Sequence, residues 1–126
     1  MKLNPDCIRD ILLTVESNDF GAYMTLDRLS EKLPIYSRDE LHYCCLKLHE
    51  GNYLELLTVN MLGTHLPGIK SIFDLTFEGH EFLENIKSDT NWNKTKTIAK
   101  EVGSFSLNTV KDIAVQVISN VINSKL

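Results

Sequence analysis

The sequence predicts an α+β fold that is mainly helical: a winged helix-turn-helix with a C-terminal helical extension. The first observation behind this prediction is the order of elements, which reads helix, short strand, helix, helix, hairpin, helix. The second is a change of charge along the chain. Residues 1–88 carry 8 Lys+Arg and 14 Asp+Glu, a net −6, whereas residues 89–126 carry 5 and 3, a net +2. We therefore expect a winged-helix domain at 1–88 and a helical extension at 89–126.

The first helix is expected to begin at Pro5. Asn4 can cap it, a proline suits the first helical position, and Asp6 opposes the positive end of the helix dipole. Apolar residues then follow at helical spacing: Ile8, Ile11, Leu12 and Val15. The segment 18–21 ends the helix, and residues 22–24 are expected to be a short extended stretch.

Two further helices form the expected helix-turn-helix. Thr25 can cap the first of them, and Pro34 ends it. Ser37 and Glu40 have the spacing of a capping box, which opens the next helix. Its inward residues are expected to be Leu41, Cys44, Cys45 and Leu48, and Gly51 ends it.

A hairpin and a fourth helix complete the expected domain. Residues 53–59 and 69–75 are apolar and β-branched enough to be strands, and residues 60–68 contain the turn formers. Thr76 is expected to cap the fourth helix. Its inward residues are expected to be Phe77, His80, Leu83 and Ile86, or their neighbours.

The extension is expected to be helical. One face would carry Trp92, Thr95, Ile98, Ala99 and Val102, before Gly103 interrupts the helix. Beyond Ser106 comes a broad apolar stripe, and its residues are our candidates for an oligomer interface: Leu107, Val110, Ala114, Val117, Ile118 and Val121. Two alternatives stay open here, because the stripe can fold back onto its own domain or join two copies in a homodimer.

Composition and motifs narrow the possible functions. The three cysteines are an odd number, two of them adjacent, which is typical of reduced thiols in a cytoplasmic protein. No apolar run approaches the length of a membrane span, so no membrane contact is expected. His42, Cys45 and His49 share a helical face, but one helix supplies too few ligands for a convincing metal site. Nucleophile elbows and phosphate-binding loops are missing. We therefore expect no catalytic residues, no metal, no cofactor and no enzymatic activity.

Double-stranded DNA is the partner that the predicted fold favours, because the second helix of a helix-turn-helix enters the major groove. The candidate contact residues are Arg38, His42, Tyr43, Lys47 and Lys70. The charge opposes this prediction: the net charge is −4, and Asp39 and Glu50 share the outward face. The hairpin tip is also apolar, at Met61, Leu62 and Leu66. A non-catalytic module that binds a host or phage protein is therefore the alternative function.

Two blocks of the sequence resemble one known family. The first is residues 1–13, with the letters MKLNPDCIRDILL. The second runs from DLT at 74–76 through EGHEFL at 78–83 and WNKTK at 92–96 to AKEVGSFS at 99–106. They resemble the domain of unknown function 2513 family, small proteins of Gram-positive bacteria and their prophages. The resemblance implies a winged helix and a bacterial or prophage origin, but no activity, and it marks residues 92–106 as a candidate for assembly or partner binding.

Overall fold

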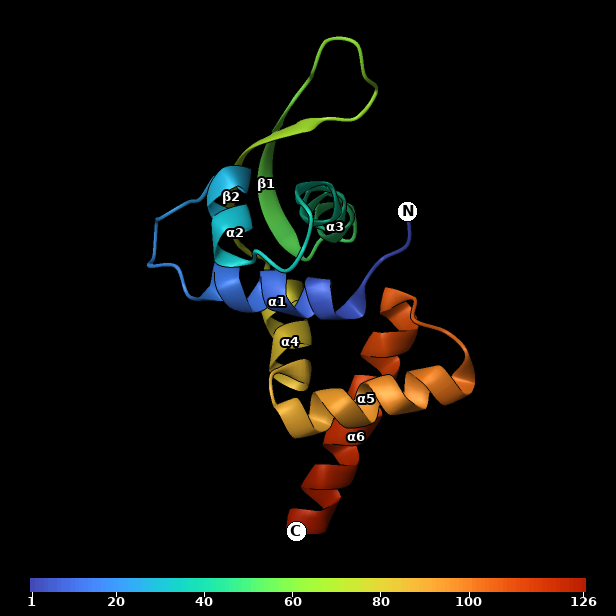
Figure 1. Cartoon of the computed structure of the whole chain (residues 1–126). Coiled ribbons are helices and arrows are strands. Elements are labelled where there is room, and N and C mark those ends of the chain that lie inside the picture. Colours follow the sequence, from blue (N-terminus) through green and yellow to red (C-terminus); the bar gives the residue numbers. More distant parts are fainter.

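The computed structural model describes all 126 residues and shows an α+β fold that is mainly helical. It has six helices and one antiparallel sheet of two strands (Figure 1). The elements are α1 (Pro5–Glu16), α2 (Leu26–Lys32), α3 (Arg38–Glu50), β1 (Leu54–Val59), β2 (Gly68–Leu75), α4 (Phe77–Ile86), α5 (Asp89–Val102) and α6 (Leu107–Lys125). None of these helices is both long enough and apolar enough to cross a membrane.

The sheet places the hairpin against the first three helices. Strands β1 and β2 pair along the hairpin, which projects from the helices (Figure 1). The expected extended stretch before α2 is present as a single bridge, in which Met24 exchanges two backbone hydrogen bonds with Ile72 of β2. The bridge gives β2 a short neighbour on its second edge, so the segment before α2 is tied to the hairpin.

The helices begin where the capping residues predict. The side chains of Asn4, Thr25, Ser37 and Thr76 accept hydrogen bonds from backbone N–H groups in the first turns of α1, α2, α3 and α4. The capping box of α3 is only half formed. Ser37 Oγ accepts from the Glu40 N–H, but Glu40 Oε1 accepts from Asn4 Nδ2 at 2.9 Å. The Glu40 carboxylate thus links α3 to the cap of α1.

One hydrophobic core runs through the chain. A cluster of 22 buried residues includes side chains of every helix and of both strands. Trp92 of α5 and Ala114 of α6 belong to the same cluster as Ile11 of α1 and Leu83 of α4. The extension that begins at residue 89 is therefore packed onto the preceding residues through a shared core.

The inward face of α4 agrees with the expected one only in part. Phe77 is 74 % exposed and His80 is exposed, whereas Gly79 and Phe82 are buried. The cause is the close approach of α4 to Tyr53, the residue just before β1. A Cβ atom at Gly79 would lie 2.1 Å from the Tyr53 carbonyl oxygen, and the Phe82 ring packs 5.4 Å from the Tyr53 ring. The prediction for Leu83 and Ile86 is confirmed.

The buried face of α5 is also narrower than the predicted one. Trp92, Thr95 and Ala99 are buried, but Ile98 is 38 % and Val102 63 % exposed. Helical spacing groups all five residues on one side, yet α4 and α6 cover only part of that arc. Gly103 ends α5 in the left-handed conformation at φ +86°, as its position predicts.

Candidate functional site

The outward face of α3 and the hairpin loop form the first candidate site. We call it the α3–hairpin surface, and it consists of Arg38, Asp39, His42, Tyr43, Leu46, Lys47, Glu50 and the loop 60–68. The inward residues of α3 are fully buried as predicted: Leu41, Cys44, Cys45 and Leu48. Burial of that stripe turns the remaining residues of the helix toward solvent and toward the hairpin.

Two of the predicted DNA contacts have carboxylate partners within the chain. The Arg38 guanidinium forms an ion pair with Asp27 of α2. Lys47 Nζ lies 3.0 Å from Glu50 Oε2 and 5.5 Å from the centre of the Tyr43 ring. The hydrogen bond and charge of Glu50 raise the pKa of Lys47. Each cation of α3 that could meet a phosphate thus has a carboxylate beside it.

A third predicted DNA contact, His42, hydrogen bonds to the hairpin loop. His42 Nε2 lies 2.8 Å from the backbone oxygen of Pro67, at the base of the hairpin loop. The second histidine of the face considered for a metal, His49, hydrogen bonds the Leu54 carbonyl through Nδ1 at 2.9 Å. Both imidazoles therefore have backbone partners in the hairpin. Lys70 lies apart on β2 and is exposed.

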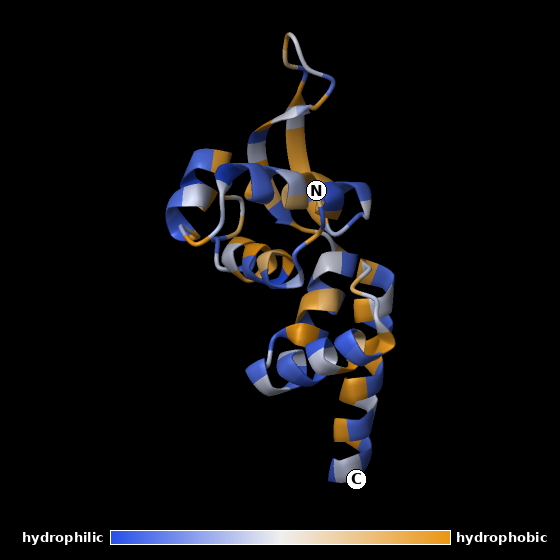
Figure 2. Ribbon diagram, turned by 45° about the vertical axis from the view of Figure 1, so that its right-hand side comes forward, coloured by the Kyte–Doolittle hydropathy of each residue, from blue (hydrophilic) through white to orange (hydrophobic).

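An apolar hollow lies between α3 and the hairpin loop. It has a volume of about 370 Å³, and the residues that line it are Met1, Asp39, His42, Tyr43, Leu46 and Leu66. At the tip of the hairpin, Leu62 is fully exposed, and Figure 2 shows this tip with hydrophobic colouring. Isolated apolar residues are common on protein surfaces, but here they line a concave site. Met1 is the lining residue that no pattern in the sequence indicated.

The three cysteines are buried thiols, and a hydrogen bond with Cys7 lowers the pKa of Cys44. Cys7, Cys44 and Cys45 are free and inaccessible to solvent. A hydrogen bond with Cys44, together with burial, raises the pKa of Cys7, and burial raises the pKa of Cys45. Since the thiolate is the nucleophile, both groups stay in the unreactive form.

The apolar stripe of α6, our candidate for an oligomer interface, is buried within the chain over only part of its length. Val110, Ala114 and Val117 are buried in the chain's own packing, and Leu107 packs against the core. These four residues pack within their own chain, as the alternative of a stripe that folds back predicts. Ile118 and Val121 remain partly exposed, and they belong to the half of α6 that extends from the body (Figure 1).

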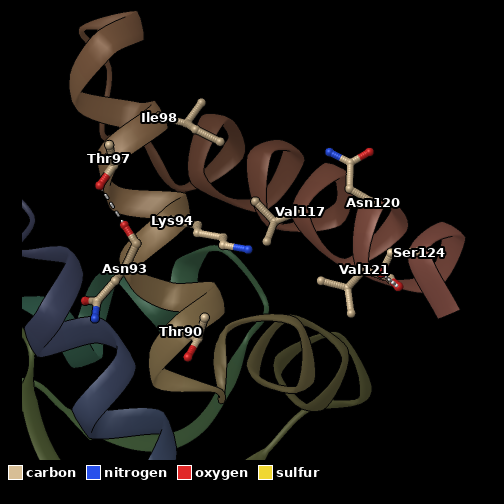
Figure 3. Close-up of a pocket in the computed structure, with 9 residues that line it drawn as sticks. All are labelled: Thr90, Asn93, Lys94, Thr97, Ile98, Val117, Asn120, Val121 and Ser124. Atoms are coloured by element: carbon tan, nitrogen blue, oxygen red, sulfur yellow. Dashed lines mark hydrogen bonds between the residues drawn. The ribbon is translucent and has the colours of Figure 1, made fainter.

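A second candidate site lies beside that half of α6. We call it the α5–α6 groove, and its volume is about 700 Å³. The residues that line it are Thr90, Asn93, Lys94, Thr97, Ile98, Val117, Asn120, Val121 and Ser124 (Figure 3). The lining contains one cation and no carboxylate, so its chemistry is that of a binding surface rather than of an acid–base site.

The two blocks that carry the family resemblance meet in space. Asp6 of α1 accepts hydrogen bonds from Trp92 Nε1 and Lys96 Nζ, both at 2.9 Å. Arg9 of α1 lies 5.9 Å from the Trp92 ring and pairs with Asp89 at 2.8 Å. This cluster was not predictable from the sequence, because its residues come from segments far apart in the chain.

Fold and sites together define a small α+β protein, mainly helical, with two candidate binding surfaces. The chain belongs to the family described as "Hypothetical protein (DUF2513)", whose model matches residues 2–106. The match ends before α6 begins. The chain is also 30 % identical over 123 residues to an "Uncharacterized protein" of Haemophilus influenzae, a match that covers 97 % of this chain and 99 % of the relative. No solved structure matches the chain.

Proposed function

We propose that the chain is a non-catalytic protein of the winged helix-turn-helix type that binds another protein through the α3–hairpin surface. The order of α2, α3 and the hairpin supports the winged-helix assignment, and the bridge between Met24 and β2 supplies the third short strand of such a frame. A host or phage protein is the class of partner that the family resemblance suggests.

The observation that carries this proposal is the apolar hollow between α3 and the hairpin. A DNA-binding surface needs cations that are free to replace the counterions of the phosphates. Here Arg38 and Lys47 are each paired with a carboxylate, and Tyr43, Leu46 and Leu66 line the space between them and the hairpin. Aromatic and aliphatic side chains in a concave site are typical anchors for a protein partner.

Site-specific photo-crosslinking tests the proposal directly. Benzoylphenylalanine replaces Leu66 in one variant and Glu84, an exposed residue of α4, in the control. After irradiation in the host cell, we expect one adduct of defined mass from position 66 and none from position 84. Adducts from both positions, or from neither, would contradict a partner site at the hairpin.

Double-stranded DNA is the second candidate, and one observation favours it: Lys70 is exposed on β2 and has no carboxylate partner in the chain. In this case Arg38 would have to leave Asp27 for a phosphate. Fluorescence anisotropy with labelled duplex fragments, including the chain's own promoter, separates the two functions. Binding that weakens steeply with salt, and weakens further in Lys70→Ala, would support DNA over protein.

A further inference from the structure

Helix α6 contains a long stretch without charge. Residues 113–124, between Asp112 and Lys125, are uncharged, and their apolar members are Ile113, Ala114, Val115, Val117, Ile118, Val121 and Ile122. Val117 is the last buried residue of the helix, and the part beyond it extends from the body (Figure 1). A helix that faces solvent ordinarily carries charges on its outer side, whereas the centres of protein interfaces are depleted in charge.

The α5–α6 groove runs along this segment. Its apolar lining consists of Ile98, Val117 and Val121, and the rest is mostly small and polar. Lys94 is the one charged residue of the lining, and it reaches across from α5 toward α6 (Figure 3). Apart from Lys94, the groove presents an apolar floor and an uncharged rim, which matches a helix whose own surface is apolar and uncharged.

The apolar pattern of the segment is self-complementary. Val117 and Ile118 mirror Val121 and Ile122 about the midpoint between residues 119 and 120. In an antiparallel pair centred on that midpoint, Ile118 lies level with the partner's Val121. In the same register Gln116 falls level with the partner's Asn123 and Ser119 with the partner's Asn120, whereas Ser124 falls level with Val115. A two-fold axis requires such a pattern, because the same patch serves both subunits.

We propose that residues 116–123 pair antiparallel with the same segment of a second copy, and that each segment lies in the α5–α6 groove of the other copy. The register brings no like charges together. Lys125 is level with the partner's Ala114, and the two copies of Lys125 stand at opposite ends of the pair. This interface uses only α5 and the half of α6 beyond the core, so Val110 and Ala114 keep their packing within the chain.

The proposed interface is independent of the α3–hairpin surface. The two surfaces share no residue, since one is formed by α3 and the hairpin and the other by α5 and α6. A monomeric chain would overturn the pairing and leave the proposed function standing. A dimer without a crosslinked partner at the hairpin would support the pairing and contradict the proposed function.

Sedimentation equilibrium of the full chain tests the pairing. We expect the mass to rise from 14.3 kDa toward twice that value as the concentration approaches about 100 μM. Ile122→Lys places a charge in the interface and is expected to keep the chain monomeric. Ile122 is 51 % exposed, so the substitution leaves the core intact, and an unchanged thermal melt checks this. Asn108→Lys, the matched control, adds the same charge at an exposed position in the first turn of α6, outside the paired segment, and should still dimerise.

Disulfide trapping tests the register. A chain with Ile118→Cys is mixed with a chain with Val121→Cys and oxidised, while the native cysteines stay buried. The antiparallel register predicts a covalent pair between the two variants and little between two copies of Ile118→Cys. Three results would overturn the proposal: a monomer at every concentration, a dimer that Ile122→Lys leaves intact, or preferential linkage of position 118 to itself.

Discussion

Trp92 Nε1 donates a hydrogen bond of 2.9 Å to Asp6 Oδ1, across 86 positions of the sequence. The bond joins the first turn of α1 to α5, and Lys96 Nζ donates to the same oxygen. The Trp92 side chain is buried in the common core, so its indole N–H needs a partner there. One carboxylate thus holds the helical extension against the first helix.

Replacing Trp92 by Phe is expected to lower the free energy of unfolding by about 2 kcal/mol. The change removes the N–H donor and leaves a small gap in the core. Urea unfolding followed by circular dichroism measures the difference. Asn93→Ala, at the neighbouring exposed position, is the control and should leave the midpoint nearly unchanged. Equal midpoints for Trp92→Phe and the control would show that the contact adds no stability.

The Asp6 carboxylate predicts a loss of stability in acid. Partial burial opposes its charge, but hydrogen bonds from Lys96 and Trp92 hold its pKa below the ordinary 3.8. The folded chain therefore binds this proton less tightly than the unfolded chain. Stability from Asp6 is present above the ordinary pKa and is lost as pH falls below about 4.

A substitution isolates this pH effect. Asp6→Asn should lower the stability at neutral pH and make its decline between about pH 5 and pH 3 shallower, because the titrating group is gone. Thermal melts of both chains across that range measure the two slopes. Parallel slopes would mean that other carboxylates account for the acid sensitivity.

Arg9→Lys is expected to cost about 2 kcal/mol of stability although the charge is kept. The guanidinium donates to the Ile86 and Lys87 carbonyls at 2.9 and 2.7 Å and to Asp89 Oδ1 at 2.8 Å. A lysine ammonium cannot reproduce this planar set of donors. Arg28→Lys is the matched control, because Arg28 is exposed and pairs only with Glu31. Chemical denaturation should separate the variants, and the prediction fails if both lose the same small amount.

Local rules predicted where the helices begin. The caps Asn4, Thr25, Ser37 and Thr76 act within three residues of their own position, so the neighbouring sequence contains the information needed. The covered arc of each helix was harder to predict. Spacing grouped Ile98 with Trp92, but only packing against α4 and α6 decides which of them is buried.

The candidate site shows the same limit. The inward residues of α3 were predicted correctly, and this defined its outward face. The partners of that face were not predictable, because Asp27 comes from a different helix and the atom beside His42 is the backbone oxygen of Pro67. Any residue at position 67 would present such an oxygen. The sequence therefore indicates which side chains face outward, but not how many of them already have a partner within the chain.

Gly79→Ala tests the close contact between α4 and Tyr53, the residue just before β1. A Cβ atom at this position would lie 2.1 Å from the Tyr53 carbonyl oxygen, far inside contact distance. That oxygen cannot move freely, because it accepts a 3.1 Å hydrogen bond from the Thr76 N–H, at the cap of α4. Alanine is intrinsically the better helix former, so propensity alone predicts a gain.

We expect the steric effect to dominate, with a loss of about 3 kcal/mol in the free energy of unfolding. Glu78→Ala, one position earlier and exposed, is the control and should change stability far less. Urea denaturation of both variants provides the comparison. A Gly79→Ala chain as stable as the parent would mean that α4 can move away from Tyr53, and the packing of Phe82 against the Tyr53 ring would then not fix the position of the helix.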